Sequence, residues 1–433
     1  MHTRRRAALL APAVVLLGLE LAGLRFLERD AVPWFIAVAL AQGAVYFVAV
    51  WWVSSGHPSP LGLVLAVALL LRLPLLLSPP FLSTDVYRYV WDGRVQAAGI
   101  NPYRHVPAAP ELEALRDERI YPHINRRDYA VTIYPPGAQG FFLATTRISE
   151  SVRWMKASIL AFEALAIWLL LRLLRAAGRP DGEVLLYAWH PLALWELAGS
   201  GHLDAAPIAL ILAALLARSR GKSALTGLAL AIATLFKLYP LVLFPALWRP
   251  RDWRMPVTFL ATVALGYLPY ASVGPGVLGF LPGYAREEGL LSGSPYFLLQ
   301  IAEALAGAPL PPALYLVPAG LFLLGLAVWA VRHGAAGDPV RACLVLGLGA
   351  VVAVSPHYAW YFVWLLPLAA LTRCLPALLL GATSFVLYIS LLWDTPGTRL
   401  WSNAGVYLPA LALFLVLWAR DHRRARLELG GHP

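Results

Sequence analysis

Long apolar runs recur along the entire chain, separated by short polar segments and by two longer loops. A bilayer core of about 30 Å is spanned by roughly 20 helical residues, and within lipid the backbone must satisfy its own hydrogen bonds. The pattern therefore predicts an all-α, polytopic transmembrane protein with about 12–14 membrane helices, folded as a single domain over residues 1–433. The runs lie at residues 7–24, 33–53, 61–78, 154–175, 184–198, 204–217, 223–237, 239–248, 255–271, 312–331, 340–355, 359–372, 375–393 and 404–420.

Basic residues set the orientation of these runs. Lys and Arg gather in short segments such as 218–222, 249–254 and 420–426, and short loops of this kind stay in the cytoplasm. The scheme predicts both termini inside and two external loops, over residues 79–152 and 272–311. Residues 1–26 have a basic start and a long apolar stretch, which favours a retained first helix over a cleaved signal peptide.

Four of the runs, between residues 184 and 248, are short for membrane spans. We interpret them as broken helices that are buried against neighbouring helices, because irregular backbone is tolerated at membrane depth only where protein covers it.

Composition agrees with this interpretation. The chain is 59% hydrophobic and 14% charged, whereas soluble domains average about 25% charged residues. The net charge of +11 comes from arginines in the segments between apolar runs, so it indicates membrane orientation and not binding to nucleic acid. Two cysteines imply no disulfide framework.

Unusual polar residues gather at the predicted outer ends of the helices. Ionisable residues at membrane depth are costly and commonly mark a functional site. Simpler roles remain open for three of them: Lys237 could extend its amine to the interface, Asp204 could cap the following helix, and His202 could be a cap or a core residue. The set consists of Asp85, Arg88, Asp92, His202, Asp204, Lys237, Tyr239 and His357.

The first external loop begins with a predicted helix. In that helix Arg88 and Asp92 are four residues apart and can pair on one face, while Asp85 faces a cavity at the membrane surface. Asp92 lies in a Trp-Asp-Gly turn and is more typical of a structural residue. Charged residues inside other runs, Arg72, Glu163 and Arg172, could form an ion pair or reach the interface, and we assign them no chemistry.

These residue types suit one kind of reaction. An aspartate can accept a proton from an attacking hydroxyl group, and cationic side chains can stabilise a departing phosphate. Aromatic faces can stack on sugar rings. An activated sugar outside the cell would have to arrive on a lipid phosphate, so the pattern suggests glycosyl transfer from a polyprenyl-phosphate sugar.

Five segments carry a family resemblance over about residues 60–370. They are "DVYRYVWDGRVQAAGINPY", "IYPPGAQ", "GHLDAAPIALILAALLA", "GLALAIATLFKLYPLVLFPAL" and "SPHYAWYFVWLLP". In this order they resemble the C-type (GT-C) glycosyltransferases of bacteria, and in particular the polyprenol-phosphate-mannose-dependent mannosyltransferases of glycosyltransferase family 87 and their alpha-1,6-mannosyltransferase relatives. The resemblance implies a multi-pass protein of the bacterial inner membrane with its active site facing the periplasm.

The resemblance also implies a lipid-linked sugar donor, an inverting displacement and a glycan or glycolipid acceptor, with no metal and no other cofactor. The family's essential aspartate corresponds to Asp85. Many relatives carry two adjacent acidic residues there, and this chain has Thr84-Asp85, which weakens a metal-binding role. The late Ser-Pro motif places His357 at the donor phosphate or sugar, and Lys237 would hold the phosphate with Arg88, His202 and Tyr239 as further contacts. We therefore expect Asp85, Lys237 and His357 to share one pocket.

Two other functions remain open. A transporter or flippase of lipid-linked sugars has many helices and buried charges, although transporters place polar sites near the midplane and often show internal repeats. A ligase of the same fold with another donor is the second, because fold does not fix function. Mannose as the sugar rests on the resemblance alone, and the sequence leaves the acceptor, the linkage and the carrier length undetermined.

Overall fold

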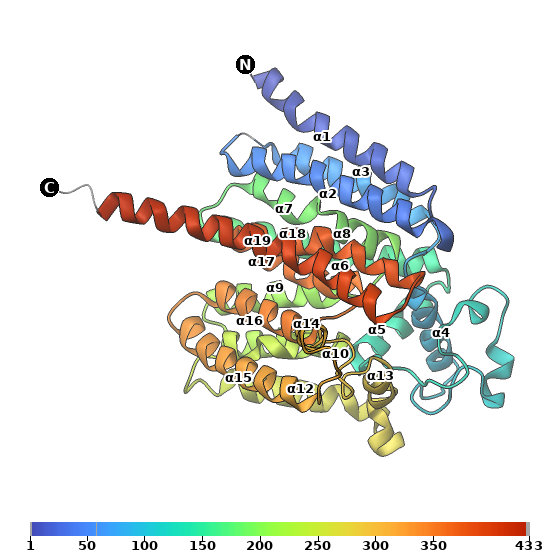
Figure 1. The fold of residues 1–433 in the computed structure, drawn as a ribbon. Coiled ribbons are helices and arrows are strands. Elements are labelled where there is room, and N and C mark those ends of the chain that lie inside the picture. Colours follow the sequence, from blue (N-terminus) through green and yellow to red (C-terminus); the bar gives the residue numbers. More distant parts are fainter. Residues whose placement is uncertain (1, 58, 430–433) are drawn as a thin grey trace.

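The computed structural model describes residues 2–57 and 59–429, and within these ranges the chain is helical with no strand. Figure 1 shows the helices packed into one bundle with a group of short helices and loops at one end. The first part of the chain forms α1 (His2–Gly23), η1 (Arg29–Ala31), α2 (Val32–Ser54), α3 (Leu61–Leu77), α4 (Asp85–Ala97), η2 (Pro110–Leu115), η3 (Tyr121–His123), α5 (Pro136–Thr146) and α6 (Val152–Ala176).

The middle of the chain is more broken. It forms η4 (Asp181–Val184), α7 (Leu185–Ala188), α8 (Pro191–Ala193), η5 (Leu194–Gly199), α9 (Ala205–Ser219), α10 (Ser223–Phe236), η6 (Tyr239–Leu243) and α11 (Phe244–Leu247). The last part forms α12 (Arg254–Tyr267), η7 (Leu268–Leu278), α13 (Leu281–Glu287), α14 (Phe297–Ala306), α15 (Ala313–Ala335), α16 (Pro339–Val354), η8 (Ala359–Leu365), α17 (Leu366–Thr372), α18 (Leu375–Thr383), η9 (Ser384–Leu391) and α19 (Pro396–Leu429).

Helix length and hydropathy confirm the predicted class, an all-helical polytopic membrane protein. Five helical stretches of the described chain are long and apolar enough to cross a membrane, and eight shorter apolar helices accompany them. The long stretches are Arg29–Ser54, Val152–Ala176, Arg254–Glu287, Ala313–Ala335 and Pro396–His422.

The prediction of broken, buried helices is confirmed for residues 184–198. The helix stops before Pro191, restarts, and then widens into the π-helix η5, and its residues are buried from Val184 to Gly199. Residues 239–248 are broken as well, into η6 and α11. The prediction is wrong for α9 and α10, which are continuous helices, because neither contains an interior proline or a π-turn that would interrupt its hydrogen bonds.

A buried ion pair fixes the core behind the loops. Arg72 of α3 binds both carboxylate oxygens of Glu163 in α6, at 2.5 and 2.8 Å, and it also donates to the carbonyls of Ala68 and Ala188. A bidentate pair of this kind satisfies the buried guanidinium. Of the two roles left open, the structure selects the structural ion pair.

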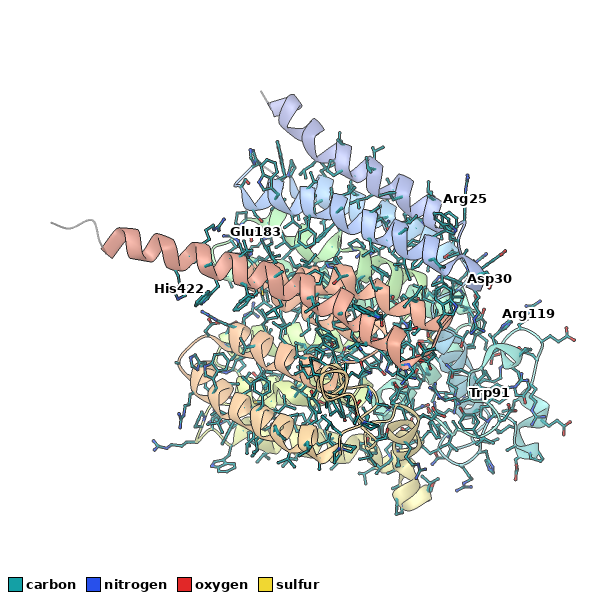
Figure 2. The ribbon with its side chains drawn as sticks, viewed as in Figure 1. Arg25, Asp30, Trp91, Arg119, Glu183 and His422 are labelled. Atoms are coloured by element: carbon teal, nitrogen blue, oxygen red, sulfur yellow. The ribbon has the colours of Figure 1, made fainter. Side chains whose placement is uncertain are left out.

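The two ends of the bundle differ. In Figure 1 the start of α1 and the end of α19 lie at one end, and α4 with the first long loop lies at the other. Figure 2 places Glu183 and His422 toward the first end and Trp91 and Arg119 at the second. At the loop end, α4 packs closely on α5, because Gly93 presents no side chain to Phe142 and Thr146.

Candidate active site

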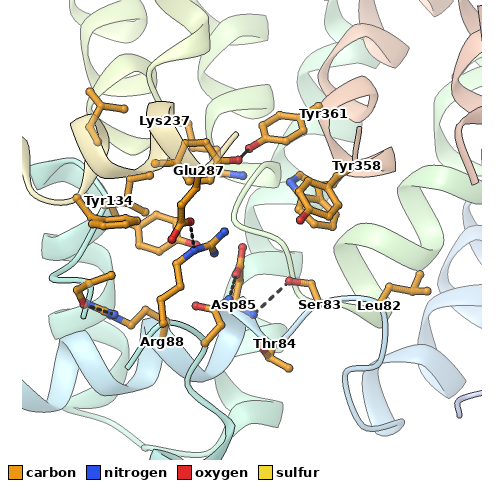
Figure 3. Close-up of a pocket in the computed structure, with 18 of the residues that line it drawn as sticks. Leu82, Ser83, Thr84, Asp85, Arg88, Tyr134, Lys237, Glu287, Tyr358 and Tyr361 are labelled. Atoms are coloured by element: carbon orange, nitrogen blue, oxygen red, sulfur yellow. Dashed lines mark hydrogen bonds and ion pairs between the residues drawn. The ribbon is translucent and has the colours of Figure 1, made fainter. Parts of the chain in front are cut away.

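A cavity of about 800 Å³ opens at the loop end of the bundle (Figure 3). Its wall includes the start of α4, the first long loop, the end of α10, α13 and the start of η8, together with single residues of η1, α2, η6 and η9. The residues that matter most for its chemistry are Asp85, Asn125, Arg126, Lys237, Glu287 and Tyr358. Segments that are more than 250 residues apart in the sequence therefore meet in one hollow.

Asp85 is the first residue of α4 and points into this cavity (Figure 3). Its backbone N–H donates to the Ser83 hydroxyl at 3.2 Å, and its Oδ1 accepts a hydrogen bond from Asn125 Nδ2 at 2.8 Å. The side chain is 22% exposed. The N-terminal end of a helix is a favourable place for an acidic residue, and α4 presents Asp85 to the cavity from this end.

His202 lies behind Asp85 and does not line the cavity. Its ring is fully buried and stacks on Trp360 at 4.4 Å between centroids. Nδ1 is 4.0 Å from Asp85 Oδ2, which is too long for a hydrogen bond. The structure thus corrects the expected position of His202: it contacts the aspartate and not the space where a substrate would sit.

Lys237 ends α10, lines the cavity, and forms an ion pair with Asp204 at 2.5 Å. Asp204 is fully buried, whereas Lys237 is 14% exposed. The capping role left open for Asp204 is wrong, because its side chain makes no cap hydrogen bond to α9. Lys237 is therefore held in place from behind, with its amine at the cavity wall.

Arg88 also lines the cavity, but its guanidinium already makes hydrogen bonds to other groups of the protein. Nε donates to Asp92 Oδ1 at 2.7 Å and Nη1 donates to the Ala130 carbonyl at 3.1 Å. Asp92 is buried, and Oδ2 accepts from Gln139 Nε2 at 3.1 Å. The predicted pairing of Arg88 with Asp92 is confirmed. The hydrogen bond from Gln139 to Asp92 connects α4 to α5.

His357 does not line this cavity, contrary to the expectation of one shared pocket. Its Nε2 is 2.7 Å from Glu288 Oε2, and it borders a smaller cavity with Asp394 and Arg399. The reason is local: Glu288, just beyond α13, engages the imidazole, and the next residue, Tyr358, occupies the wall instead.

Aromatic rings cover much of the wall. Tyr239 lines the cavity and stacks on Trp364 with centroids 5.0 Å apart. Tyr134, Tyr358 and Tyr361 line it as well (Figure 3). Flat faces of this kind, each with a polar edge, suit the face of a sugar ring.

Sequence reasoning missed several residues of the site. Asn125 and Arg126 come from the charged middle of the first long loop, which shows no periodic pattern. Arg126 adopts a positive φ of 52° and pairs with Glu287 of α13 at 2.6 Å. Tyr284 of α13 shares a hydrogen bond with Tyr361. The first contact joins the two long loops and the second joins α13 to η8, which no local sequence signal would have indicated.

Two further findings concern metal binding and similarity to known proteins. Among the residues that the structure describes, there is no group of three or more His, Cys, Asp or Glu side chains placed to hold a metal ion. A comparison with curated proteins gives no match.

A family model does match, over residues 7–249, and it is described as the N-terminal domain of alpha-(1->6)-mannopyranosyltransferase. This range contains Asp85, Asp204 and Lys237, and it ends before α13 and His357. It covers more than half of the chain, so the protein belongs to the alpha-(1->6)-mannopyranosyltransferase family and is a membrane glycosyltransferase.

Proposed function

We propose that the protein transfers a mannosyl group from a polyprenyl-phosphate carrier to a glycan or glycolipid acceptor, with Asp85 as the general base. The observation that carries the proposal is the Asp85 carboxylate, which stands at a helix N-terminus in an 800 Å³ cavity with an amine, Lys237, on the same wall. A base and a cation in one aromatic-lined cavity are the two groups that glycosyl transfer from a phosphate carrier requires.

The reaction is a single displacement. The acceptor oxygen forms a bond to the anomeric carbon of the donor, and the bond from that carbon to the carrier phosphate breaks on the opposite face. Asp85 accepts the proton of the acceptor hydroxyl group. The phosphate leaves with the bonding electron pair and an additional negative charge, which the Lys237 amine stabilises. The anomeric configuration inverts, and neither a metal nor another cofactor takes part.

Asp204 prepares Lys237 for this role. The lysine is held at 2.5 Å from a fully buried carboxylate, so its position is fixed before the phosphate charge develops. Electrostatic stabilisation is most effective when the charged group needs no reorganisation during the reaction.

One side of the cavity suits the lipid. Its wall includes Val32 of α2, Phe81 and Leu82 before α4, and Leu391 of η9. These residues are apolar, and α2 and η9 lie in apolar helical stretches, so this side of the cavity suits the polyprenyl chain of the donor. The polar side, with Asn125 and Arg126, would receive the acceptor from the periplasm.

The distribution of termini supports this orientation. The start of α1 and the end of α19 lie at the end of the bundle opposite α4 (Figure 1), whose first residue lines the cavity. With the basic segments in the cytoplasm, the cavity opens on the periplasmic side, where a lipid carrier rather than a nucleotide supplies the activated sugar.

The test is Asp85→Asn in proteoliposomes, with synthetic polyprenyl-phosphate mannose as donor and octyl alpha-mannoside as acceptor. We expect transfer to fall by about 10²- to 10⁴-fold, the usual contribution of a general base. Asp128→Asn is the matched control, because Asp128 lies in the same loop but is 73% exposed. Near-normal turnover of Asp85→Asn would refute the assignment, and counterflow of the lipid-linked sugar without bond formation would favour a transporter.

A further inference from the structure

A fully buried glutamate lies behind the candidate base and has no part in the reaction described so far. Glu196 belongs to the π-helix η5, a rare element that is frequently found at functional sites. The chain folds back after it, so that the His202 backbone N–H donates to the Glu196 carbonyl at 2.9 Å. Gly201 makes this turn possible with a φ of +72°, and a Cβ there would meet Lys156 at 2.8 Å. The turn brings the Glu196 and His202 side chains together.

Four side chains lie in order from the core to the cavity, and both imidazole nitrogens of the buried His202 lack a hydrogen-bond partner within the described part of the chain. The Tyr388 hydroxyl donates to Glu196 Oε1 at 2.6 Å. Glu196 Oε2 is 3.5 Å from His202 Nε2, and His202 Nδ1 is 4.0 Å from Asp85 Oδ2. Glu196 and His202 are both fully buried. Asp85 is thus the cavity-facing end of a row of polar groups.

Burial determines how many protons this row holds. Isolated buried charges cost several kcal/mol each, so the Glu196–His202 couple is most stable with no net charge. The Tyr388 hydroxyl already occupies Oε1, which leaves Oε2 to share a proton with Nε2. A histidine whose Nε2 accepts a proton carries a hydrogen on Nδ1, and that hydrogen faces Asp85.

The other charged groups around His202 do not replace this hydrogen. They are Lys237 at the end of α10 and Asp204 at the start of α9. These two form an ion pair with each other, so their charges largely cancel at Asp85. On the cavity side, Asn125 donates to Asp85 Oδ1 and the uncharged Tyr134 hydroxyl also lies near the carboxylate, while His202 Nδ1 lies 4.0 Å from Oδ2.

We propose that Glu196 is a positioning residue for the transfer reaction: through His202 it keeps an N–H directed at Asp85 Oδ2, which orients the carboxylate. This inference rests on the proposed role of Asp85 as general base. The 4.0 Å separation fits such a role, because contacts of this kind are often long in unliganded enzymes and shorten in the substrate complex.

The test compares three variants in proteoliposomes with synthetic polyprenyl-phosphate mannose and octyl alpha-mannoside. Glu196→Met removes the group that fixes the imidazole hydrogen. We expect kcat to fall roughly 10- to 100-fold, as when a partner that orients a functional side chain is lost, with the KM for the donor unchanged.

Glu196→Gln is the conservative variant. Its amide N–H can donate to His202 Nε2 while its carbonyl accepts from Tyr388, so we expect most of the lost rate to return. His202→Phe keeps a ring to stack on Trp360 but has no Nδ1–H, and it should match Glu196→Met in rate. If Glu196→Met does not fold, the difference in transfer rate between Glu196→Gln and His202→Phe tests the proposal.

Two results would overturn the proposal: a Gln variant as slow as the Phe variant, or a Met variant that folds and keeps the wild-type rate. These two results can be told apart from a failure of the proposed function, because only the Asp85→Asn variant tests whether Asp85 is the general base. Wild-type turnover of Asp85→Asn would refute the assignment of Asp85 as the base. An inactive Asp85→Asn variant with unimpaired Glu196→Met and His202→Phe variants would refute only the positioning role of Glu196.

Discussion

Replacement of Lys237 separates its contribution to the fold from its contribution to the reaction. Lys237→Met leaves Asp204 fully buried without its cation, since the pair is 2.5 Å apart and the carboxylate has no exposure. Removing one partner of a buried ion pair destabilises a protein by about 3–5 kcal/mol. We therefore expect a marked loss of stability from this single substitution.

The double variant Lys237→Met/Asp204→Leu behaves differently. Replacing both members of a buried pair by apolar residues is often close to neutral, so the free energy of unfolding should return to near the wild-type value. Mannosyl transfer should not return, because the cation that stabilises the leaving phosphate is still missing. Loss of a single such group typically lowers kcat by about 10²- to 10³-fold.

The assay measures both quantities on the same preparations. Unfolding by SDS in mixed micelles gives the stability of each variant, and transfer from synthetic polyprenyl-phosphate mannose gives the rate at a temperature where all variants are folded. Asp204→Leu alone completes the cycle and measures the coupling of the two side chains. Recovery of transfer in the double variant would refute the reasoning, because it would show that Lys237 acts only by satisfying Asp204.

Two further predictions concern the elements that hold the site. Gly93→Ala places a Cβ 2.5 Å from Thr146 Oγ1. Such overpacking should lower the free energy of unfolding by about 1–3 kcal/mol, and the resulting displacement of α4 should slow transfer. Gly140→Ala in the adjacent helix meets no atom within 4 Å and is the control in the same unfolding and transfer assays. Equal stability of the two variants would contradict this account. Asp117 anchors the first loop: although partial burial acts in the opposite sense, the hydrogen bond from Arg94 lowers the pKa of Asp117 to about 2. Because its pKa is depressed, Asp117 stabilises the loop above the ordinary Asp pKa of about 3.9, and this stabilisation is lost as the pH falls toward 2. Cleavage of the loop by pepsin, normalised to a peptide substrate, should therefore rise from pH 4 to pH 2 in the wild type, while Asp117→Asn should be cleaved readily at both pH values. An Asn variant with the same pH-dependent protection would argue against this role of Asp117.

The fold class and part of the site were within reach of the sequence, because both depend on local patterns. Apolar runs indicated the helices, and the spacing of Arg88 and Asp92 indicated a pair that the structure contains at 2.7 Å. Polar residues at apolar helix ends pointed to Asp85 and Lys237, which do line one cavity. Each of these signals lies within a few residues of the position it describes.

The remaining features depend on contacts between distant segments. Asn125 reaches Asp85 from forty positions away, and Arg126 meets Glu287 across 161 positions. The expectation for His357 was wrong because Glu288, in another loop, binds its imidazole. Glu196 was overlooked because a single acidic residue in an apolar run carries no periodic signal, and its importance depends on a π-turn that no residue pattern specified.

The cavity is assembled unequally along the chain. Asp85, Asp204 and Lys237 all precede residue 250, within the range of the family model, while the wall opposite comes from α13 and η8. Under the proposed function, changes in α13 would reshape the cavity wall without replacing Asp85 or Lys237. Variation in residues 272–311 would then give relatives an evolutionary route to a different acceptor with the same pair of reacting side chains.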